Sequence, residues 1–280
     1  MKSEHQNIAW HPAFVEAIQL ELEAYRDVLE FHPEYQLTAE PLKIDCVVIK
    51  KLKDVVITKN IAAIFREANL LEYKSPDDYV SIQDFYKVYG YACLYASLEK
   101  VPITSLTMTF VESHYPRELL AHLRQVRGYK VENNRPGIYT VSGDILPIQL
   151  IDNRRLSADE NLWLKDLDNR LEPLEIRHLT SEIYNLGKAA RVKAYLDAIT
   201  TANIDSLQEA LKMSGSGLTL DQVFEEAGLV AKWEAKGRQS EKFDIAQNMV
   251  NLGLPLETIV SATSLDPEKV KELSGGKGSG

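Results

Sequence analysis

The chain has 280 residues, of which 45% are hydrophobic and 26% are charged, and this composition is ordinary for a globular protein. The net charge of −9 argues against tight nonspecific binding to nucleic acid, because phosphate attraction supplies most of that binding. The two cysteines, Cys46 and Cys93, lie in apolar contexts that favour small buried hydrophobes over a disulfide or a zinc site.

The first predicted elements are a helix and two strands. Residues 12–30 place apolar side chains at helical spacing, which predicts an amphipathic helix. On this helix Glu21 lies about 60° from the centre of the apolar face and therefore points near the core, whereas Glu23 falls on the far side. The stretches "LKIDCVVIKK" and "NLLEYKSP" are rich in Val, Ile and Leu and predict strands, with a turn and a short helix between them.

The predicted elements continue to residue 155. Residues 81–99 predict a second helix, capped by Ser81, and "SLTMTFVES" predicts a third strand, followed by a helix at "PRELLAHLRQV". The stretch "NNRPGIYTVSGDILPIQLID" predicts a hairpin that closes the first domain. We therefore expect an α/β domain, a mixed sheet flanked by helices, at residues 1–155.

Beyond residue 156 the strand signals vanish. Residues 156–273 show only helical patterns and predict a C-terminal all-helical region, with its most flexible joint at "SGSG", residues 214–217. The last part has the rhythm of a short helix, a turn and another short helix. Residues 274–280 predict a flexible tail.

No apolar run follows the first lysine, and nowhere do 18 apolar residues occur in succession. A signal peptide needs the first feature and a membrane-spanning helix needs the second, so the sequence predicts neither. We expect a cytoplasmic protein that makes no membrane contact.

The charges on the two predicted strands form a candidate site. Side chains two apart on a strand point the same way, so Glu72 and Lys74 share one side of the second strand, as Asp45 and Val47 do on the first. Carboxylate oxygens suit Mg²⁺ or Mn²⁺, which stabilises charge on a reacting phosphodiester and activates water, and a lysine beside the metal can assist. The six histidines are scattered without the spacing of metal ligands.

This pattern resembles that of a known family. "KIDCVVIKK" followed by "LLEYKSP" is similar to the D…(D/E)xK pattern of the PD-(D/E)XK nuclease superfamily, and more closely to bacterial Rpn-type, recombination-promoting nuclease and transposase-related proteins. The likeness covers about residues 9–130, and residues 245–273 resemble the C-terminal segment of many Rpn-type proteins. The resemblance implies a restriction-endonuclease-like fold and metal-dependent cleavage of DNA, linked to mobile elements or defence.

The resemblance also implies roles for individual residues. Asp45 and Glu72 are implied to bind Mg²⁺ or Mn²⁺, Lys74 to assist catalysis, and Glu21, by its position on the first helix, to complete the site. The residues implied to line the site from the next helix are Gln83, Tyr86 and Lys87.

Other interpretations of the same residues stay open. Glu72 and Lys74 also fit the solvated face of an edge strand, Glu21 fits the polar edge of a pocket, and Tyr86 fits core packing as well as base stacking. The main alternative function is a catalytically silent relative that uses the same fold to bind nucleic acid or protein partners. An acidic surface is compatible with that alternative.

Basic residues form one further candidate surface, either a contact for a phosphate backbone or an ordinary solvated face. They lie along one side of the helix at 116–126 and just beyond it, and are Arg117, Arg124, Arg127 and Lys130. The terminal "DPEKVKEL" is acidic where a groove-reading helix needs basic residues. We therefore expect the helical region to serve packing or homo-oligomer assembly.

Overall fold

The computed structural model describes residues 8–36, 43–50, 55–187, 189–213, 222–225, 227–229, 242–243, 245–252 and 254–275. The chain divides into two compact units, Met1–Val223 and Phe224–Gly280. Among the described residues, no helix combines the length and the apolar character that crossing a bilayer requires.

The first unit is built on a seven-stranded mixed sheet with the strand order β1-β2-β3-β4-β7-β6-β5. The first three strands are antiparallel neighbours, β3, β4 and β7 run parallel, and β6 and β5 continue the sheet antiparallel. The strands are β1 (Leu29–Gln36), β2 (Lys43–Lys50), β3 (Ala68–Tyr73), β4 (Leu106–Glu112), β5 (Lys130–Arg135), β6 (Ile138–Ser142) and β7 (Ile148–Asp152).

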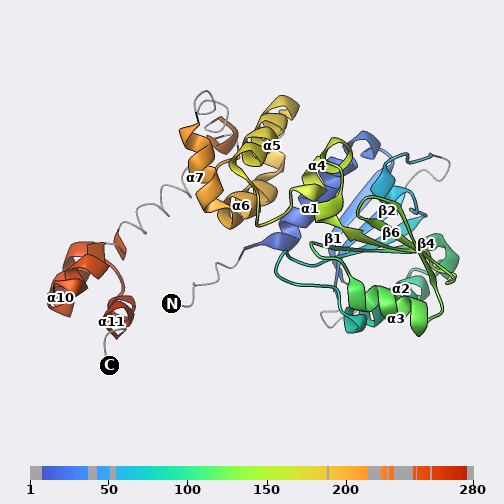
Figure 1. Ribbon diagram of the computed structural model, residues 1–280, viewed down its shortest axis with the longest axis horizontal. Helices are drawn as coiled ribbons and strands as arrows, with labels where there is room; N and C mark the ends of the chain where they lie inside the picture. The colour runs from blue at the N-terminus through green and yellow to red at the C-terminus, as the bar shows by residue number, and fades with distance from the viewer. Residues whose placement is uncertain are drawn as a thin grey trace. The chain divides into compact units, whose positions relative to one another are not determined.

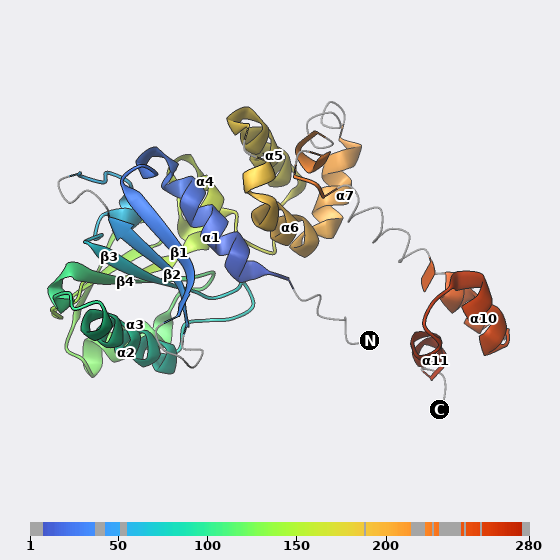
Figure 2. The same ribbon diagram turned by 180° about the vertical axis from the view of Figure 1, so that it is seen from behind.

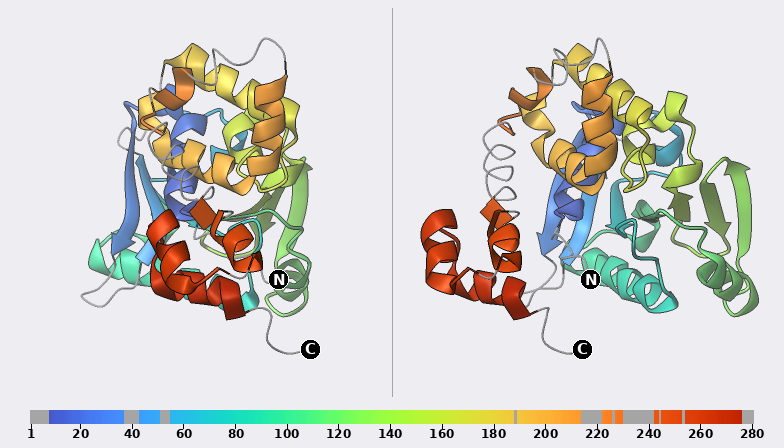
Figure 3. Two further views of the ribbon diagram at one scale, coloured as in Figure 1. Left: turned by 90° about the vertical axis from the view of Figure 1, so that its left-hand side faces the viewer. Right: turned by 60° about the vertical axis from the view of Figure 1, so that its left-hand side comes forward.

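Helices cover both faces of this sheet (Figure 1, and from behind in Figure 2). Helices α2 (Ile82–Leu98) and α3 (Arg117–Gln125) pack on one face, and α1 (Trp10–Glu21) and α4 (Ala158–Lys165) lie on the other. Helices α5 (Pro173–Leu186), α6 (Lys193–Ala202) and α7 (Ile204–Lys212) form a further group, in which α6 packs on α1 (Figure 3). Short 3-10 turns span Glu23–Tyr25, Asn60–Ala62, Ile103–Ser105, Asn153–Arg155 and Ala189–Arg191.

Burial on both faces explains the composition of the central strands. Every residue of β3, β4 and β7 is buried, as expected for parallel strands that helices cover on both sides. The core under α2 and α3 takes alternate residues from each strand, among them Val47, Leu70, Met108, Phe110 and Leu150. On the opposite face, the rings of Phe14 from α1 and Tyr73 from β3 stack with 4.6 Å between centroids.

Strand directions bring four acidic residues to one end of the sheet. Strand β2 is antiparallel to β3, so its beginning lies beside the end of β3, and the parallel strands β4 and β7 end there as well. The acidic residues at this end are Asp45, Glu72, Glu112 and Asp152. Because helices cover both faces of the sheet, this end is where its acidic side chains can meet a ligand.

The predicted first helix is longer than the observed one. Helix α1 ends at Glu21, and the predicted span to residue 30 also includes a short 3-10 turn and the start of β1. Strand β1 was not predicted, because it carries Pro33 in its middle. A proline lacks the N–H that a central strand needs, but β1 lies at the sheet edge, where one side of the strand makes no ladder.

The boundary predicted near residue 155 also differs from the observed one, since the first compact unit extends to Val223. Helices α4 and α6 both pack on α1 and bury apolar side chains, including Trp163, Leu164 and Leu196. Residues 156–213 are helical as predicted, but they belong to the same unit as the sheet.

The second unit contains the short helix pair that the sequence predicts, α10 (Leu256–Thr263) and α11 (Pro267–Gly275). Its small core consists of Ala246, Ile259, Leu265 and Val270. The residues Ser274 and Gly275, predicted to begin the tail, lie in the last turn of α11. The "SGSG" joint, residues 220–221, 226, 230–241 and 244 of the predicted helix at 220–252, and residues 276–280 lie outside the described residues.

Candidate functional site

Asp45 and Glu72 are neighbours on adjacent antiparallel strands, one step beyond the registered pair Cys46 and Leu71. Asp45 Oδ2 accepts the backbone N–H of Tyr73 at 2.7 Å, and Asp45 Oδ1 lies 3.6 Å from His11 Nε2. Glu72 is 3% exposed. The two carboxylates therefore face one region at the end of the sheet.

The two oxygens of Glu72 have different surroundings. Oε1 accepts a hydrogen bond from Lys87 Nζ at 2.7 Å and lies 4.0 Å from Lys74 Nζ. Oε2 is buried and has no hydrogen-bond partner within the described residues. A buried carboxylate oxygen without a partner is the feature expected where a ligand from outside the chain completes the coordination.

Burial raises the pKa of both carboxyl groups. For Glu72 the charge of Asp45 raises the pKa further, while Lys87 and Lys74 lower it. For Asp45, burial is opposed by His11 and by the N–H of Tyr73. Because the charge of Asp45 raises the cost of ionising Glu72, a cation placed between the two carboxyl groups would stabilise their charged forms.

Lys74 and Asp84 form the second part of the site. Lys74 Nζ lies 2.8 Å from Asp84 Oδ1, and both side chains are largely buried. Helix α2 begins here because Ser81 and Asp84 form a capping box, in which each side chain accepts the other's backbone N–H. Burial raises the pKa of Asp84, but hydrogen bonds from Lys74 and Ser81 lower it, and the pKa is lowered as a result.

One helical turn separates Asp84 from Lys87, so both face the end of β3. Lys87 Nζ lies 3.8 Å from Asp84 Oδ1, in addition to its contact with Glu72. We call the five residues Asp45, Glu72, Lys74, Asp84 and Lys87 the charged cluster. It contains the predicted residues Asp45, Glu72, Lys74 and Lys87, together with Asp84, which was not predicted.

The structure does not bring Glu21 into the charged cluster. Glu21 is buried, as its position on the helix predicts, but its Oε2 lies 2.5 Å from Lys59 Nζ and its Oε1 accepts the N–H of Leu164 at 2.9 Å. Burial raises the pKa of Glu21, and Lys59 partly opposes this. Glu21 therefore joins α1 to α4, and none of these contacts connects it to the charged cluster.

Two further residues predicted to line the site lie beside it. Tyr86 is exposed, and its hydroxyl lies 2.9 Å from His122 Nε2 on α3, so its contacts are with the neighbouring helix. Gln83 is exposed, and within the described residues no hydrogen bond or ion pair connects it to the charged cluster.

The predicted basic stripe divides into two kinds of residue. The Arg127 guanidinium lies 3.2 Å from Asp144 and over the rings of Tyr89 and Tyr129, so it is engaged within the fold. Lys130 pairs with Glu132 on the same strand. The residues of the stripe that stay exposed on α3 are Arg117 and Arg124.

Sequence reasoning missed Asp84 and His11. The spacing of Ser81 and Asp84 is a recognisable capping box, so a signal for Asp84 was present, but nothing in the spacing predicts its contact with Lys74. His11 reaches Asp45 from the first turn of α1, a contact that depends on how the helix packs on the sheet.

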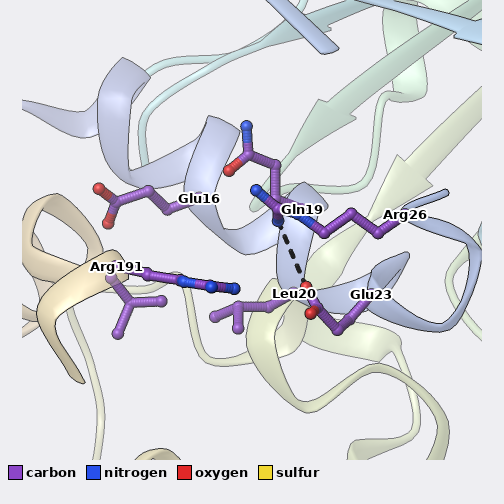
Figure 4. Close-up of a pocket in the computed structure, with 7 residues that line it drawn as sticks. Glu16, Gln19, Leu20, Glu23, Arg26 and Arg191 are labelled. Carbon is purple, nitrogen blue, oxygen red and sulfur yellow. Dashed lines mark hydrogen bonds and ion pairs between the residues drawn. The ribbon is translucent and has the colours of Figure 1, made fainter. Parts of the chain in front are cut away.

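A separate cavity of about 370 Å³ lies beside α1 (Figure 4). In Figure 4 the Arg191 side chain extends toward α1 from the opposite side of the cavity, and Arg26 pairs with Glu23. Glu16 at its edge accepts the backbone N–H of Tyr195 at 2.6 Å. None of the residues of the charged cluster lines this cavity.

Within the part of the chain that the structure describes, no group of three or more His, Cys, Asp and Glu residues has the geometry to hold a metal ion. Mg²⁺ is commonly bound by one or two carboxylates, with waters and substrate phosphates as the remaining ligands. Asp45 and Glu72, with Oε2 of Glu72 unpartnered, fit that kind of site.

Comparison with known proteins gives no further guide to this site. No protein-family model matches the chain, and neither a curated protein nor a solved structure does.

Proposed function

We propose that the chain is a Mg²⁺- or Mn²⁺-dependent nuclease that hydrolyses DNA phosphodiester bonds. The observation that carries this proposal is the adjacent pair of carboxylates, the partly buried Asp45 and the buried Glu72, with one oxygen of Glu72 lacking a partner among the described residues. The similarity of "KIDCVVIKK" and "LLEYKSP" to the PD-(D/E)XK pattern supports it.

The arrangement of elements is a second support. The chain passes from α1 through the antiparallel strands β1, β2 and β3 to α2, and then to β4, which is parallel to β3. This order places the aspartate on the second strand and the glutamate and lysine at the end of the third. It agrees with the restriction-endonuclease-like fold that the resemblance implies.

The residues of the charged cluster divide the work of such a reaction. Asp45 and Glu72 hold the divalent cation, which supplies charge stabilisation at the phosphate and an activated water when it is bound. The Lys74 ammonium, held by Asp84 beside Glu72, stabilises negative charge that develops on the phosphate oxygens. Lys87 orients the Glu72 carboxylate through Oε1 and leaves Oε2 available.

One observation favours a second function, a silent nuclease-fold protein that binds nucleic acid or protein partners. Two of the three carboxylates of the charged cluster already have an ammonium partner, because Lys87 contacts Glu72 and Lys74 contacts Asp84. Such a network can stabilise a fold without any metal.

A calorimetric titration of the protein with Mn²⁺ distinguishes the two functions. We expect one bound ion in the wild-type protein, and loss of binding in Asp45→Asn and in Glu72→Gln. Glu209→Gln, which changes an exposed glutamate on α7, serves as the matched control and keeps the ion. A wild-type protein that binds no Mn²⁺ at millimolar concentration favours the silent protein.

A further inference from the structure

Glu112, the last residue of β4, carries a second buried carboxyl group at the same end of the sheet. The residue is 1% exposed. Its Oε2 accepts the backbone N–H of Val80 at 3.1 Å, while its Oε1 has no hydrogen-bond partner within the described residues. Leaving a buried polar atom unpaired is unfavourable, so a partner from outside the chain is expected.

Glu112 lines a cavity of about 360 Å³. Its buried lining residues are Val80, Glu112 and Pro116, and the exposed rings of Tyr79 and Tyr115 also line it. The Arg155 guanidinium lies over the Tyr115 ring, 5.6 Å from the ring centroid. The cavity therefore combines aromatic rings at the surface with two buried polar atoms that have no partner within the described residues, Glu112 Oε1 and His114 Nδ1.

The chemistry of Glu112 indicates what the cavity can take. Burial raises the pKa of Glu112 to about 8, and the carboxylates of Asp152, Asp78 and Asp84 add to the increase. At pH 7 the group is therefore mostly protonated, and its Oε1 can donate or accept a hydrogen bond. A neutral carboxyl group is a poor ligand for a cation, but it complements the edge of a nucleobase.

The cavity adjoins the charged cluster through the segment that begins α2. Within this segment Val80 N–H bonds to Glu112, and Asp84, four residues later, holds Lys74. In the sheet, Glu112 lies two residues beyond Phe110, the register partner of Glu72. A nucleic-acid strand with one phosphate at the charged cluster would therefore pass close to the cavity.

We propose that this cavity binds one unstacked nucleobase of a single-stranded segment, with the base edge on Glu112 and its face against Tyr79 or Tyr115. The proposal rests on the proposed function, because it takes the strand at the charged cluster to be nucleic acid. Proteins that hold single strands stack bases on aromatic rings, and each stack strengthens binding. Arg117, exposed at the cavity, provides a contact for a phosphate.

Photo-cross-linking tests this assignment. The full-length protein is mixed, in the presence of a metal chelator, with a short single-stranded oligonucleotide in which 5-iodouracil replaces thymine, and is then irradiated. Mass spectrometry of the cross-linked peptides is expected to identify Tyr79 or Tyr115. In parallel, an abasic oligonucleotide of the same length, which keeps every phosphate, is expected to bind at least tenfold more weakly.

Variants connect the cross-link to Glu112. Glu112→Ala is expected to reduce the yield about tenfold, since one hydrogen bond at a buried site is worth about 1.4 kcal/mol. If Glu112→Ala does not fold, Tyr115→Leu at the exposed rim provides the same test, because it removes a stacking surface. Glu209→Gln, distant from the cavity in sequence and exposed on α7, is expected to leave the yield unchanged.

Each outcome decides one question. Cross-links confined to other peptides, or equal affinity for the abasic strand, overturn the assignment. If free 5-iodouridine monophosphate cross-links as efficiently as the oligonucleotide, the cavity binds a mononucleotide, and the proposal that it binds a base of a single strand is overturned. A wild-type protein that cross-links at Tyr115 but does not cleave DNA with Mn²⁺ rejects only the nuclease, and a wild-type protein that cleaves DNA without that cross-link rejects only the cavity. Asp45→Asn, which is expected to lose cleavage, keeps the cavity and is expected to cross-link like the wild-type protein.

Discussion

Lys74 lies between two carboxylates, with its Nζ 2.8 Å from Asp84 and 4.0 Å from Glu72. A largely buried ammonium group costs several kcal/mol unless it is paired, and Asp84 supplies the pair. Because Asp84 is itself fixed by the capping box with Ser81, the lysine is held in place beside Glu72.

We expect Lys74→Met to slow DNA cleavage about 100-fold, because one electrostatic contact made mainly in the transition state is lost. Methionine keeps the apolar stem, so Mn²⁺ binding and the melting temperature change much less. Single-turnover nicking at saturating Mn²⁺ measures the effect. Lys43→Met, at an exposed lysine on β2, is the matched control, and an unchanged rate in folded Lys74→Met makes Lys74 only a counter-ion.

Glu112 gives a prediction for stability against pH. Its pKa is raised from 4.5 to about 8 in the folded protein, chiefly by burial, with the carboxylates of Asp152, Asp78 and Asp84 adding to the increase. Between these pH values the folded state holds a proton that the unfolded chain has lost. The free energy of unfolding therefore falls as pH rises through this window, by up to about 1.4 kcal/mol per pH unit.

We expect Glu112→Gln, which cannot ionise, to remove this contribution. Chemical denaturation at pH 5 and at pH 7.5 measures it: the wild-type protein loses stability relative to Glu112→Gln as the pH rises. Parallel losses in the two proteins contradict a buried, proton-holding Glu112.

Residue patterns predicted part of the candidate site. Asp45, Glu72 and Lys74 could be found because a strand alternates its faces and the pattern resembles a known one. Lys87 followed from the resemblance. The contacts of Asp84 and His11 depend on how α1 and α2 pack against the sheet, and no local spacing encodes them.

At the scale of elements, α1 is held by charged as well as apolar contacts. Its last residue, Glu21, pairs with Lys59 and accepts the N–H of Leu164 at the end of α4. These two bonds connect the helix to the loop before β3 and to the helical layer. Position on a helix face predicted that Glu21 is buried, but not which partner it meets there.

We expect Glu21→Gln to lower the free energy of unfolding by about 1–3 kcal/mol, because the partly buried Lys59 loses its charged partner. Mn²⁺ affinity is expected to stay the same, since Glu21 does not face the charged cluster. Chemical denaturation measures the free energy of unfolding, and metal titration of the same sample measures the Mn²⁺ affinity. Glu23→Gln, at a residue whose pair with Arg26 is exposed, is the control; a selective loss of Mn²⁺ binding in Glu21→Gln returns Glu21 to the site.

Elements with strong periodicity were predicted well. The strands β2, β3 and β4 and helix α2 agree with their predicted spans to within a few residues, because apolar residues follow one period throughout. Strand β1 was missed because its sequence, "LEFHPEYQ", lacks that alternation and contains Pro33. Its place is set by pairing with β2, which is a long-range contact.

At the scale of the whole molecule, the helical residues 156–213 belong to the same unit as the sheet. Side chains of α4 and α6 bury apolar surface on α1, which is itself packed on the sheet. The change from strand to helix patterns at residue 156 is real, but a change of secondary structure does not mark a boundary between cores. The contacts that decide the boundary are not visible in the composition.

We expect a chain that ends at residue 223 to melt cooperatively near the main transition of the full-length protein. A chain that ends at residue 155 exposes one apolar side of α1 and is expected to melt at a lower temperature or to aggregate. Circular dichroism and size-exclusion chromatography compare the two. Equal stability of both chains contradicts the packing of α4 and α6 on α1.

The central claim is that Asp45 and Glu72 hold the divalent cation for DNA cleavage, and nicking of supercoiled plasmid tests it most directly. We expect the wild-type protein and Glu209→Gln to nick the plasmid with Mn²⁺ and not with a chelator. Asp45→Asn and Glu72→Gln, purified in the same way and folded by circular dichroism, are expected to lose the activity. Equal nicking by all four proteins, or no nicking by the wild-type protein that has bound Mn²⁺, contradicts the claim.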